Sequence, residues 1–335
     1  MAPPRFVRVS LGSAITLGLT KGSVQAAPSA IYLLTFHDSK CFANCLFCAQ
    51  ARSSTSRSDL LSRVTWPTFS TKEVLSSVQE LWNRRLIRRV CIQSLNYADA
   101  FTDVLNLVES FHLVAGLPIS LSSQPFRGEQ LQSLADAGLQ RIGIPLDTAT
   151  EDLFSRIKGH EAGGAYTWNE HLDALKMSVE IFGKGFVSTH FIVGLGETDT
   201  HLISIIQKMV DIGVHPGLFA FTPIPGTHME DLHPPPLSRY RKIQVAHYLI
   251  TKGIVAYSMM KFDQKGDLMK YGIPPQRLKE TIASGDPFLT SGCPDCNRPF
   301  YNEKVRGPLY NYPRRPTQDE LAQIEVDLLI GDTFP

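Results

Sequence analysis

Residues 41–48 read Cys-Phe-Ala-Asn-Cys-Leu-Phe-Cys and follow a strand-like apolar segment at 31–36, Ile-Tyr-Leu-Leu-Thr-Phe. Three residues separate Cys41 from Cys45 and two separate Cys45 from Cys48, so one loop can bring three thiolates to a single metal centre. Soft thiolates select iron–sulfur clusters or zinc over hard cations. The stretch predicts an iron–sulfur cluster at the end of a strand, with one iron left open to a further ligand.

A zinc site, or three buried cysteines that pack as small apolar side chains, is the alternative interpretation of this run. Structural zinc sites usually combine paired Cys-x2-Cys units and use four protein ligands. The single triad departs from that arrangement, so we favour the iron–sulfur interpretation.

The run resembles the cysteine signature of the radical S-adenosylmethionine (SAM) superfamily, in which the methionyl amine and carboxylate of SAM chelate the open iron. Phe47, the aromatic residue before the third cysteine, belongs to that pattern. The resemblance implies a [4Fe-4S] cluster on Cys41, Cys45 and Cys48, with SAM as a cofactor. In this family one electron cleaves SAM, and the 5'-deoxyadenosyl radical then removes a hydrogen from an unactivated carbon. A reduced ferredoxin or flavodoxin-type protein would supply the electron.

The remaining three of the six cysteines suggest a second cluster. Cys91 lies in a short strand-like segment, whereas Cys293 and Cys296 flank a tight turn near the C-terminus. These three would hold the second cluster together with a non-cysteine or exogenous fourth ligand. A disulfide between Cys293 and Cys296, with Cys91 in the core, is the open alternative.

The charge balance argues against nucleic-acid or anionic-membrane binding. The 335 residues include 33 basic and 32 acidic side chains, a net charge of +1, and so provide no broad basic field. No apolar run reaches the length of about 18 residues that a membrane span needs. The apolar stretch at 9–19 contains Ser, Gly and Thr, so we expect no secretory signal. An oxygen-sensitive cluster needs a reducing compartment, and we expect a cytoplasmic protein.

Strand-like and helix-like segments alternate after the cysteine loop, which predicts an α/β fold with a mostly parallel sheet. We expect a partial to nearly complete (βα) barrel of the triosephosphate isomerase type, the radical SAM kind, with active-site residues at the C-terminal ends of its strands. Strands are expected at 31–37, 90–95, 118–123, 141–147, 186–193, 217–222 and 254–259. Helices are expected near 72–85, 99–115, 129–137, 170–182, 200–213 and 238–252. The expected divisions are an N-terminal extension at 1–30, a barrel at 31–265, and a C-terminal extension at 266–335 that carries Cys293 and Cys296 over the barrel mouth.

Residues 191–198, Phe-Ile-Val-Gly-Leu-Gly-Glu-Thr, resemble the fifth-strand motif of the superfamily. The resemblance implies that Ile192 and Val193 pack on the adenine ring and that Gly194 lets the ring approach the backbone. The alternative is an ordinary turn from a strand into a helix. His190 stands where the family motif begins with glycine, so the local geometry differs here.

Residues 141–148 resemble the fourth-strand segment of biotin synthases, in which an aspartate accepts hydrogen bonds from the ribose hydroxyls. The resemblance gives Asp147 that role, and the open alternative is that Asp147 caps the following helix. Lys158 and Arg156 are candidates to reach the methionyl carboxylate, with a surface basic pair as the alternative.

Three further features resemble those of biotin synthases. The Gly-Gly-Glu that usually follows the second strand in the superfamily, and grips the methionyl amine, is absent, and Gln-Ser-Leu-Asn stands at 93–96 instead. Biotin synthases also depart from Gly-Gly-Glu at this point. They carry an auxiliary-cluster cysteine on the second strand, where Cys91 falls. Pro-Ile-Pro-Gly-Thr at 223–227 is a sixth-strand feature of the same subgroup. Residues 290–303 most resemble the biotin-synthase-related proteins of archaea and some bacteria, which act as two-protein lipoyl synthases.

That last resemblance implies sulfur insertion at carbon 6 or carbon 8 of an octanoylated lysine on a lipoyl carrier protein or peptide. The auxiliary cluster would donate the sulfur, and a sister radical SAM lipoyl synthase protein would complete the product. Ser258 and Arg298 are candidates for the fourth cluster ligand, each with ordinary hydrogen bonding as the alternative. Competing interpretations are a biotin synthase that acts on dethiobiotin, an enzyme whose second cluster relays electrons, and a cluster- or zinc-stabilised binding scaffold.

Overall fold

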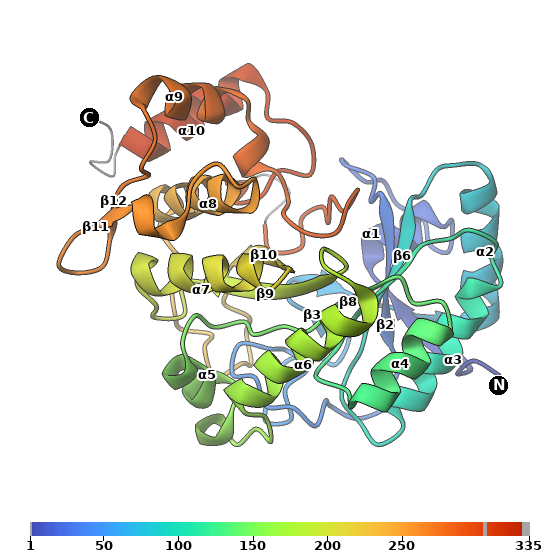
Figure 1. Ribbon diagram of the computed structural model, residues 1–335. Helices are drawn as coiled ribbons and strands as arrows, with labels where there is room; N and C mark the ends of the chain where they lie inside the picture. Colours follow the sequence, from blue (N-terminus) through green and yellow to red (C-terminus); the bar gives the residue numbers. More distant parts are fainter. Residues whose placement is uncertain (1, 304–306, 330–335) are drawn as a thin grey trace.

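The computed structural model describes residues 2–303 and 307–329, so parts of the expected C-terminal extension lie outside the described residues. An eight-stranded sheet with the order β10-β9-β8-β7-β6-β2-β1-β5 forms its centre (Figure 1). Six consecutive strands of this sheet run parallel, which confirms the α/β partial barrel. They are β2 (Ala30–Thr35), β6 (Arg89–Gln93), β7 (Ile119–Ser122), β8 (Arg141–Gly143), β9 (Val187–Val193) and β10 (Val214–Ala220).

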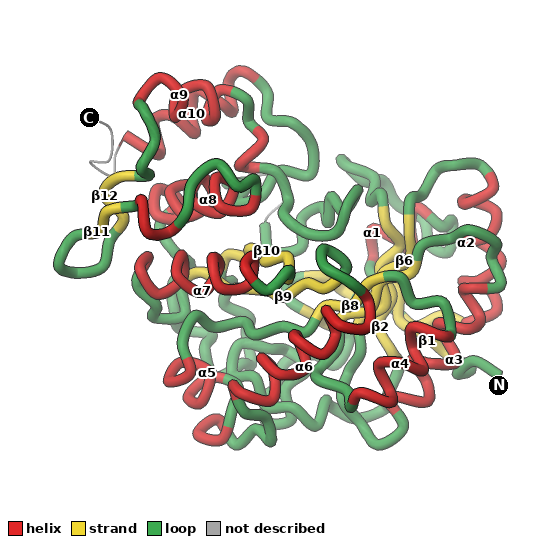
Figure 2. Tube along the Cα trace, in the orientation of Figure 1, coloured by secondary structure: helices red, strands yellow, loops and turns green. Residues whose placement is uncertain are grey.

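Helices connect successive parallel strands and cover the outer face of the sheet (Figures 1 and 2). Side chains alternate along β9, so that Val187, Phe191 and Val193 join the core while Ser188, His190 and Ile192 face the opposite side. The inner face is therefore free to line a pocket. The helices are α2 (Thr71–Asn83), α3 (Ala100–His112), α4 (Gly128–Asp136), α5 (Glu151–Ile157), α6 (Trp168–Phe182), α7 (Asp199–Asp211) and α8 (Leu237–Thr251).

The N-terminal segment is part of the sheet rather than an appendage to it. Strand β1 (Phe6–Val9) pairs antiparallel with β2 on one side and with β5 (Thr68–Ser70) on the other. Val7 and Val9 are fully buried in the main core, and α1 (Leu11–Thr16) follows directly. The expected boundary at residue 30 therefore passes through one packed unit.

The expected seventh strand at 254–259 is wrong. The segment forms the short 3-10 helix η2 (Tyr257–Met259), and the backbone N–H of Tyr257 donates to Gln207 on α7 rather than to a strand. Periodicity alone does not distinguish a short apolar strand from a segment packed on a helix, which explains the error.

The C-terminal region packs on α8 and returns to the sheet. Arg241 of α8 is 1% exposed and donates to the carbonyl oxygens of Leu309 and Tyr310, which fixes the returning chain. Figure 1 shows α9 and α10 beyond α8, with a long loop that leads back toward β10. The elements are β11 (Lys261–Phe262), β12 (Leu268–Lys270), α9 (Pro275–Ala283), η3 (Asp286–Phe288) and α10 (Gln318–Leu329).

Three small elements complete the fold: a hairpin of β3 (Leu60–Leu61) and β4 (Val64–Thr65), and the 3-10 helix η1 (His160–Ala162). Within the described ranges, no helix combines the length and the apolar character that crossing a membrane requires.

Candidate functional site

The first cysteine set lies in the loop that leaves the C-terminal end of β2. Backbone N–H groups point at two of its sulfurs: Asn96 N lies 3.1 Å from Cys41 Sγ, and Gln50 N lies 3.4 Å from Cys48 Sγ. A turn closes the loop, because Cys48 N donates to the carbonyl oxygen of Cys45 at 2.9 Å. Backbone donors of this kind stabilise thiolates, so the loop suits a metal-bound form of these cysteines.

Burial keeps the free thiols neutral. Desolvation raises the pKa of Cys41 and of Cys45, and it raises the pKa of Cys48 to about 12. Metal ligation requires thiolates, so iron binding must displace their protons.

All six cysteines are free thiols, which removes the disulfide alternative for Cys293 and Cys296. Among residues 2–303 and 307–329, no group of three or more His, Cys, Asp or Glu side chains is arranged around a single metal ion. The first set supplies three thiolates, whereas a structural zinc site usually takes four protein ligands.

The second cysteine set joins a strand to the C-terminal loop. Cys91 lies on β6 in register with Tyr32 of β2 and Ser120 of β7. Cys296 Sγ lies 3.2 Å from the phenol oxygen of Tyr32, and Cys293 Sγ lies 3.8 Å from Ser120 Oγ. The three sulfurs expected to share a cluster are thus gathered on the inner face of the sheet.

Hydrogen bonds from the residues before β2 hold the C-terminal loop in this position. Asn297 Oδ1 accepts from the backbone N–H of Ser29 at 2.9 Å, and Asn297 Nδ2 donates to Ala27 at 2.9 Å. On the other side of the loop, Leu218 N of β10 donates to Ser291 Oγ at 2.7 Å. The loop therefore bridges two strands on opposite sides of the partial barrel.

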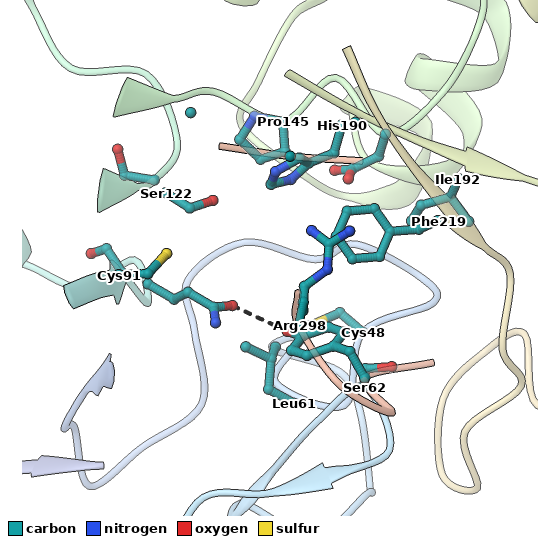
Figure 3. A pocket seen from close by; sticks show the side chains of 18 of the residues that line it. Cys48, Leu61, Ser62, Cys91, Ser122, Pro145, His190, Ile192, Phe219 and Arg298 are labelled. Atoms are coloured by element: carbon teal, nitrogen blue, oxygen red, sulfur yellow. Dashed lines mark hydrogen bonds between the residues drawn. The ribbon is translucent and has the colours of Figure 1, made fainter. Parts of the chain in front are cut away.

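Both cysteine sets line one pocket of about 250 Å³. Figure 3 labels Cys48 of the first set and Cys91 of the second. Arg298 extends into the pocket, with its guanidinium carbon 3.8 Å from the centre of the Phe219 ring and Nη2 donating to Ser291 O at 3.1 Å. Burial, followed by the charge of Arg298, lowers the pKa of His190 to about 3, so this imidazole is neutral. Besides the cysteines, the pocket lining thus includes an arginine, an aromatic ring and an uncharged imidazole.

Asp147 lies at the pocket wall and is paired with Lys158. The two side chains are 2.7 Å apart at Nζ and Oδ2, and Lys158 also donates to the carbonyl oxygen of Pro145. The side chain of Lys158 is 0% exposed and is not among the residues that line the pocket, so a contact of its ammonium with the methionyl carboxylate stays a prediction. In this structure the ammonium holds the Asp147 carboxylate in place.

Helix α5, which follows Asp147, is capped by a different residue. The side chain of Thr150 accepts from Leu153 N and so caps the helix in place of Asp147. Arg156 is exposed and pairs with Asp152 on the same helix, which makes it a surface residue rather than a ligand of SAM. Asp147 itself adopts a positive φ of 66° and bridges to β9, which turns its side chain to the pocket.

The fifth-strand motif divides between pocket and core. Phe47 and Ile192 line the pocket, whereas Val193 is fully buried among core residues on the other face of β9. The prediction that Val193 packs on adenine is therefore wrong, because neighbouring strand residues face opposite sides. Gly194 lies beyond the pocket lining in a turn with φ of 105°.

Glu197 stabilises that turn, a role that the sequence alone did not reveal. Its two carboxylate oxygens accept from Gly194 N at 2.9 Å and from Leu195 N at 2.8 Å. Arg239 of α8 pairs with Glu197 and with Asp199, and so ties the turn to the outer helix layer. In the sequence, the Glu-Thr pair at 197–198, directly after Gly196, indicates such a turn.

The two candidates for a fourth cluster ligand differ in position. Ser258 is exposed on η2 and does not line the pocket, so its prediction as a ligand is wrong; the strand on which it was placed does not form. Arg298 lines the pocket two residues after Cys296.

Comparison with known proteins identifies the family. A model of the Radical SAM superfamily matches residues 37–209, which include the first cysteine set, Asp147 and the fifth-strand motif. The chain belongs to the radical SAM superfamily. A [4Fe-4S] cluster and SAM are the cofactors that this membership implies, and Cys41, Cys45 and Cys48 lie within the matched range as the candidate thiolate set.

Several relatives of this radical SAM enzyme are named biotin synthase. That of Delftia acidovorans (strain DSM 14801 / SPH-1) is 26% identical over 276 residues, 78% of this chain and 72% of the relative. That of Prochlorococcus marinus (strain MIT 9215) is 26% identical over 265 residues, 76% of this chain and 73% of the relative. Among solved structures, methylornithine synthase superposes with a TM-score of 0.52 at 13% identity, covering 66% of this chain and 62% of that protein. The last similarity concerns the fold alone, and this chain spans less than two thirds of that protein.

Sequence reasoning did not single out Tyr32, Ser120 or Phe219. Each lies on an inner-face position of a parallel strand. Tyr32 and Phe219 are aromatic, whereas the residues directly before and after each of them in the sequence are aliphatic. Period-two alternation indicates which residues share a face, but it does not say which face lines the pocket.

Proposed function

We propose that this radical SAM enzyme inserts sulfur into an unactivated carbon–hydrogen bond, and that a second cluster on Cys91, Cys293 and Cys296 donates the sulfur. The observation that carries the proposal is that both cysteine sets line the same pocket. A carbon radical formed beside the first set then lies next to the second without leaving the enzyme. The biotin synthase relatives, whose name denotes a sulfur-inserted product, support this class of reaction.

The residues have separate tasks in this proposal. Cys41, Cys45 and Cys48 hold the cluster that delivers the electron for SAM cleavage. Asp147 accepts hydrogen bonds from the ribose hydroxyls, while Phe47 and Ile192 pack against the adenine. Arg298, whose guanidinium makes a single hydrogen bond to the described residues, is the candidate fourth ligand of the second cluster.

Two substrates fit this proposal. The first is an octanoyl chain on a lipoyl carrier protein, because two of the three second-set cysteines come from the C-terminal loop rather than from barrel strands. A sister radical SAM protein would then insert the other sulfur, and a ferredoxin or flavodoxin-type protein in the reducing interior of the cell would supply electrons. The second is dethiobiotin, which the names of the relatives favour over the octanoyl chain.

The test is anaerobic mass spectrometry of both substrates with the full chain, SAM and dithionite. An octanoyl-lysyl carrier peptide, with and without the sister protein, is compared with free dethiobiotin. A mass gain of one sulfur, with matching loss of sulfide from the protein, supports sulfur insertion and identifies the substrate.

Deoxyadenosine without a sulfur product in either reaction, and with the second cluster intact, would contradict the proposal. It would favour an enzyme whose second cluster relays electrons. If no deoxyadenosine formed under strong reduction, the result would favour the interpretation as a cluster- or zinc-stabilised binding scaffold.

A further inference from the structure

Tyr32 is a buried phenol directly beside the second cysteine set. It belongs to β2, an interior strand of the sheet, the residue is 5% exposed, and its oxygen lies 3.2 Å from Cys296 Sγ. We propose that Tyr32 donates an O–H···S hydrogen bond to Cys296 and thereby sets the reduction potential of the second cluster. This inference rests on the second cluster of the proposed function.

The direction of the hydrogen bond follows from a second contact. The backbone N–H of Arg298 donates to the phenol oxygen of Tyr32 at 3.0 Å. The oxygen is thus an acceptor toward the C-terminal loop, and its single proton remains available for the sulfur. A metal-bound Cys296 carries no proton, so only the phenol can donate in that pair.

The hydrogen-bond donors to sulfur differ between the two cysteine sets. Backbone N–H groups of Asn96 and Gln50 point at sulfurs of the first set. At Cys296 the donor is a side chain, which a single substitution can remove. A variant at Tyr32 therefore addresses the second cluster selectively.

The packing around Tyr32 holds this geometry. Asn297, the residue after Cys296, is bonded to Ser29 and Ala27, three and five residues before Tyr32 on the same chain segment. Cys91 is the register partner of Tyr32 on β6. The phenol and the sulfur are therefore held by the same local network.

A hydrogen bond to a cluster sulfur stabilises the more negatively charged, reduced form and raises the reduction potential. If a cluster held here gave a sulfide to a carbon radical, one electron of a sulfide lone pair would enter the new carbon–sulfur bond and the other would reduce an iron. Tyr32 thus favours the electron distribution that sulfur insertion requires. It is a positioning residue, since it acts through Cys296 and not on the substrate.

The test is an anaerobic redox titration, monitored by electron paramagnetic resonance, of the full chain reconstituted with iron and sulfide. The signal that changes on addition of SAM reports the first cluster, and the signal lost in Cys293→Ala reports the second. In Tyr32→Phe we expect a more negative potential for the second cluster alone. The ratio of reduced to oxidised second cluster at a fixed potential should fall about fivefold, the effect of one ordinary hydrogen bond.

Tyr240→Phe is the matched control, because it removes a fully buried phenol that bonds to Asn311 and contacts no cysteine. In the wild type, the reduced second cluster should also show coupling to an exchangeable proton that Tyr32→Phe lacks. An unchanged potential with full iron content, an equal shift in Tyr240→Phe, or loss of the second cluster in Tyr32→Phe would overturn the inference. Wild-type protein with iron for only one cluster would instead overturn the proposed function.

Discussion

Replacement of Lys158 by Met should destabilise the protein by breaking a buried ion pair. Lys158 Nζ lies 2.7 Å from Asp147 Oδ2, with side chains 0% and 11% exposed. The change leaves the Asp147 carboxylate without its counter-charge and also removes the donor to Pro145. Removing one partner of a buried pair costs about 3–5 kcal/mol, because the other charge remains buried and uncompensated. We expect a loss of that size in the free energy of unfolding at neutral pH.

Urea unfolding followed by tryptophan fluorescence measures this loss, and Trp168 is a nearby reporter because its ring lies 5.8 Å from that of Phe154 on α5. Arg156→Met is the control, since it removes an exposed ion pair from the same helix and should change stability by about 0.5 kcal/mol or less. The double variant Lys158→Met with Asp147→Asn should recover part of the loss, with a coupling energy of about 0.5–3 kcal/mol. A loss below about 1 kcal/mol in Lys158→Met, or strictly additive effects, would refute the argument that burial makes this pair costly to break.

Three further predictions concern the cysteines and the turn after β9. Because burial raises the thiol pKa values of the first cysteine set, iron retention against a chelator should strengthen from about pH 6.5 to about pH 8.5, and a flat profile would contradict proton displacement. Cys41→Ala should abolish deoxyadenosine formation, whereas Cys293→Ala should retain some deoxyadenosine without sulfur product; equal loss of both would count against the donor role. Gly194→Ala should cost about 1–3 kcal/mol in urea unfolding, because φ is 105° and the new Cβ lies 3.0 Å from Pro235, while Gly12→Ala, with no atom within 4 Å, should cost less than that.

The sequence predicted the six parallel strands and the helices between them because each carries a clear local pattern. The position of the cysteine loop after β2 was equally predictable, since its three cysteines lie within eight consecutive residues that follow that strand. Strand β1 was missed because its pairing with both β2 and β5 is a tertiary property, and its flanking residues resemble an irregular leader. The strand expected at 254–259 failed because that short apolar run packs on α7.

Pocket-lining residues could be predicted where they belong to a local sequence motif. Their prediction failed where the direction of the side chain determines whether a residue faces the pocket. Ile192 and Val193 are equally apolar, and only the position of the sheet determines that one lines the pocket and the other the core. Nothing in the sequence around Lys158 indicated that it would form an ion pair with Asp147, eleven residues earlier. The sequence likewise gave no indication of the contact between Tyr32 and Cys296, which are 264 residues apart.

The link between Asn297 and Ser29 has a consequence for the order in which the protein is completed during synthesis. These residues are 268 positions apart, yet together they fix the loop that carries Cys293 and Cys296. Chains emerge from the ribosome with their N-terminal parts first. The loop with Cys41, Cys45 and Cys48 is therefore available for iron delivery well before Cys293 exists, whereas the other triad assembles only after nearly the whole chain has emerged. Iron would thus reach the two triads at separate times. Under the proposed function, a chain interrupted before residue 293 could cleave SAM but could not insert sulfur.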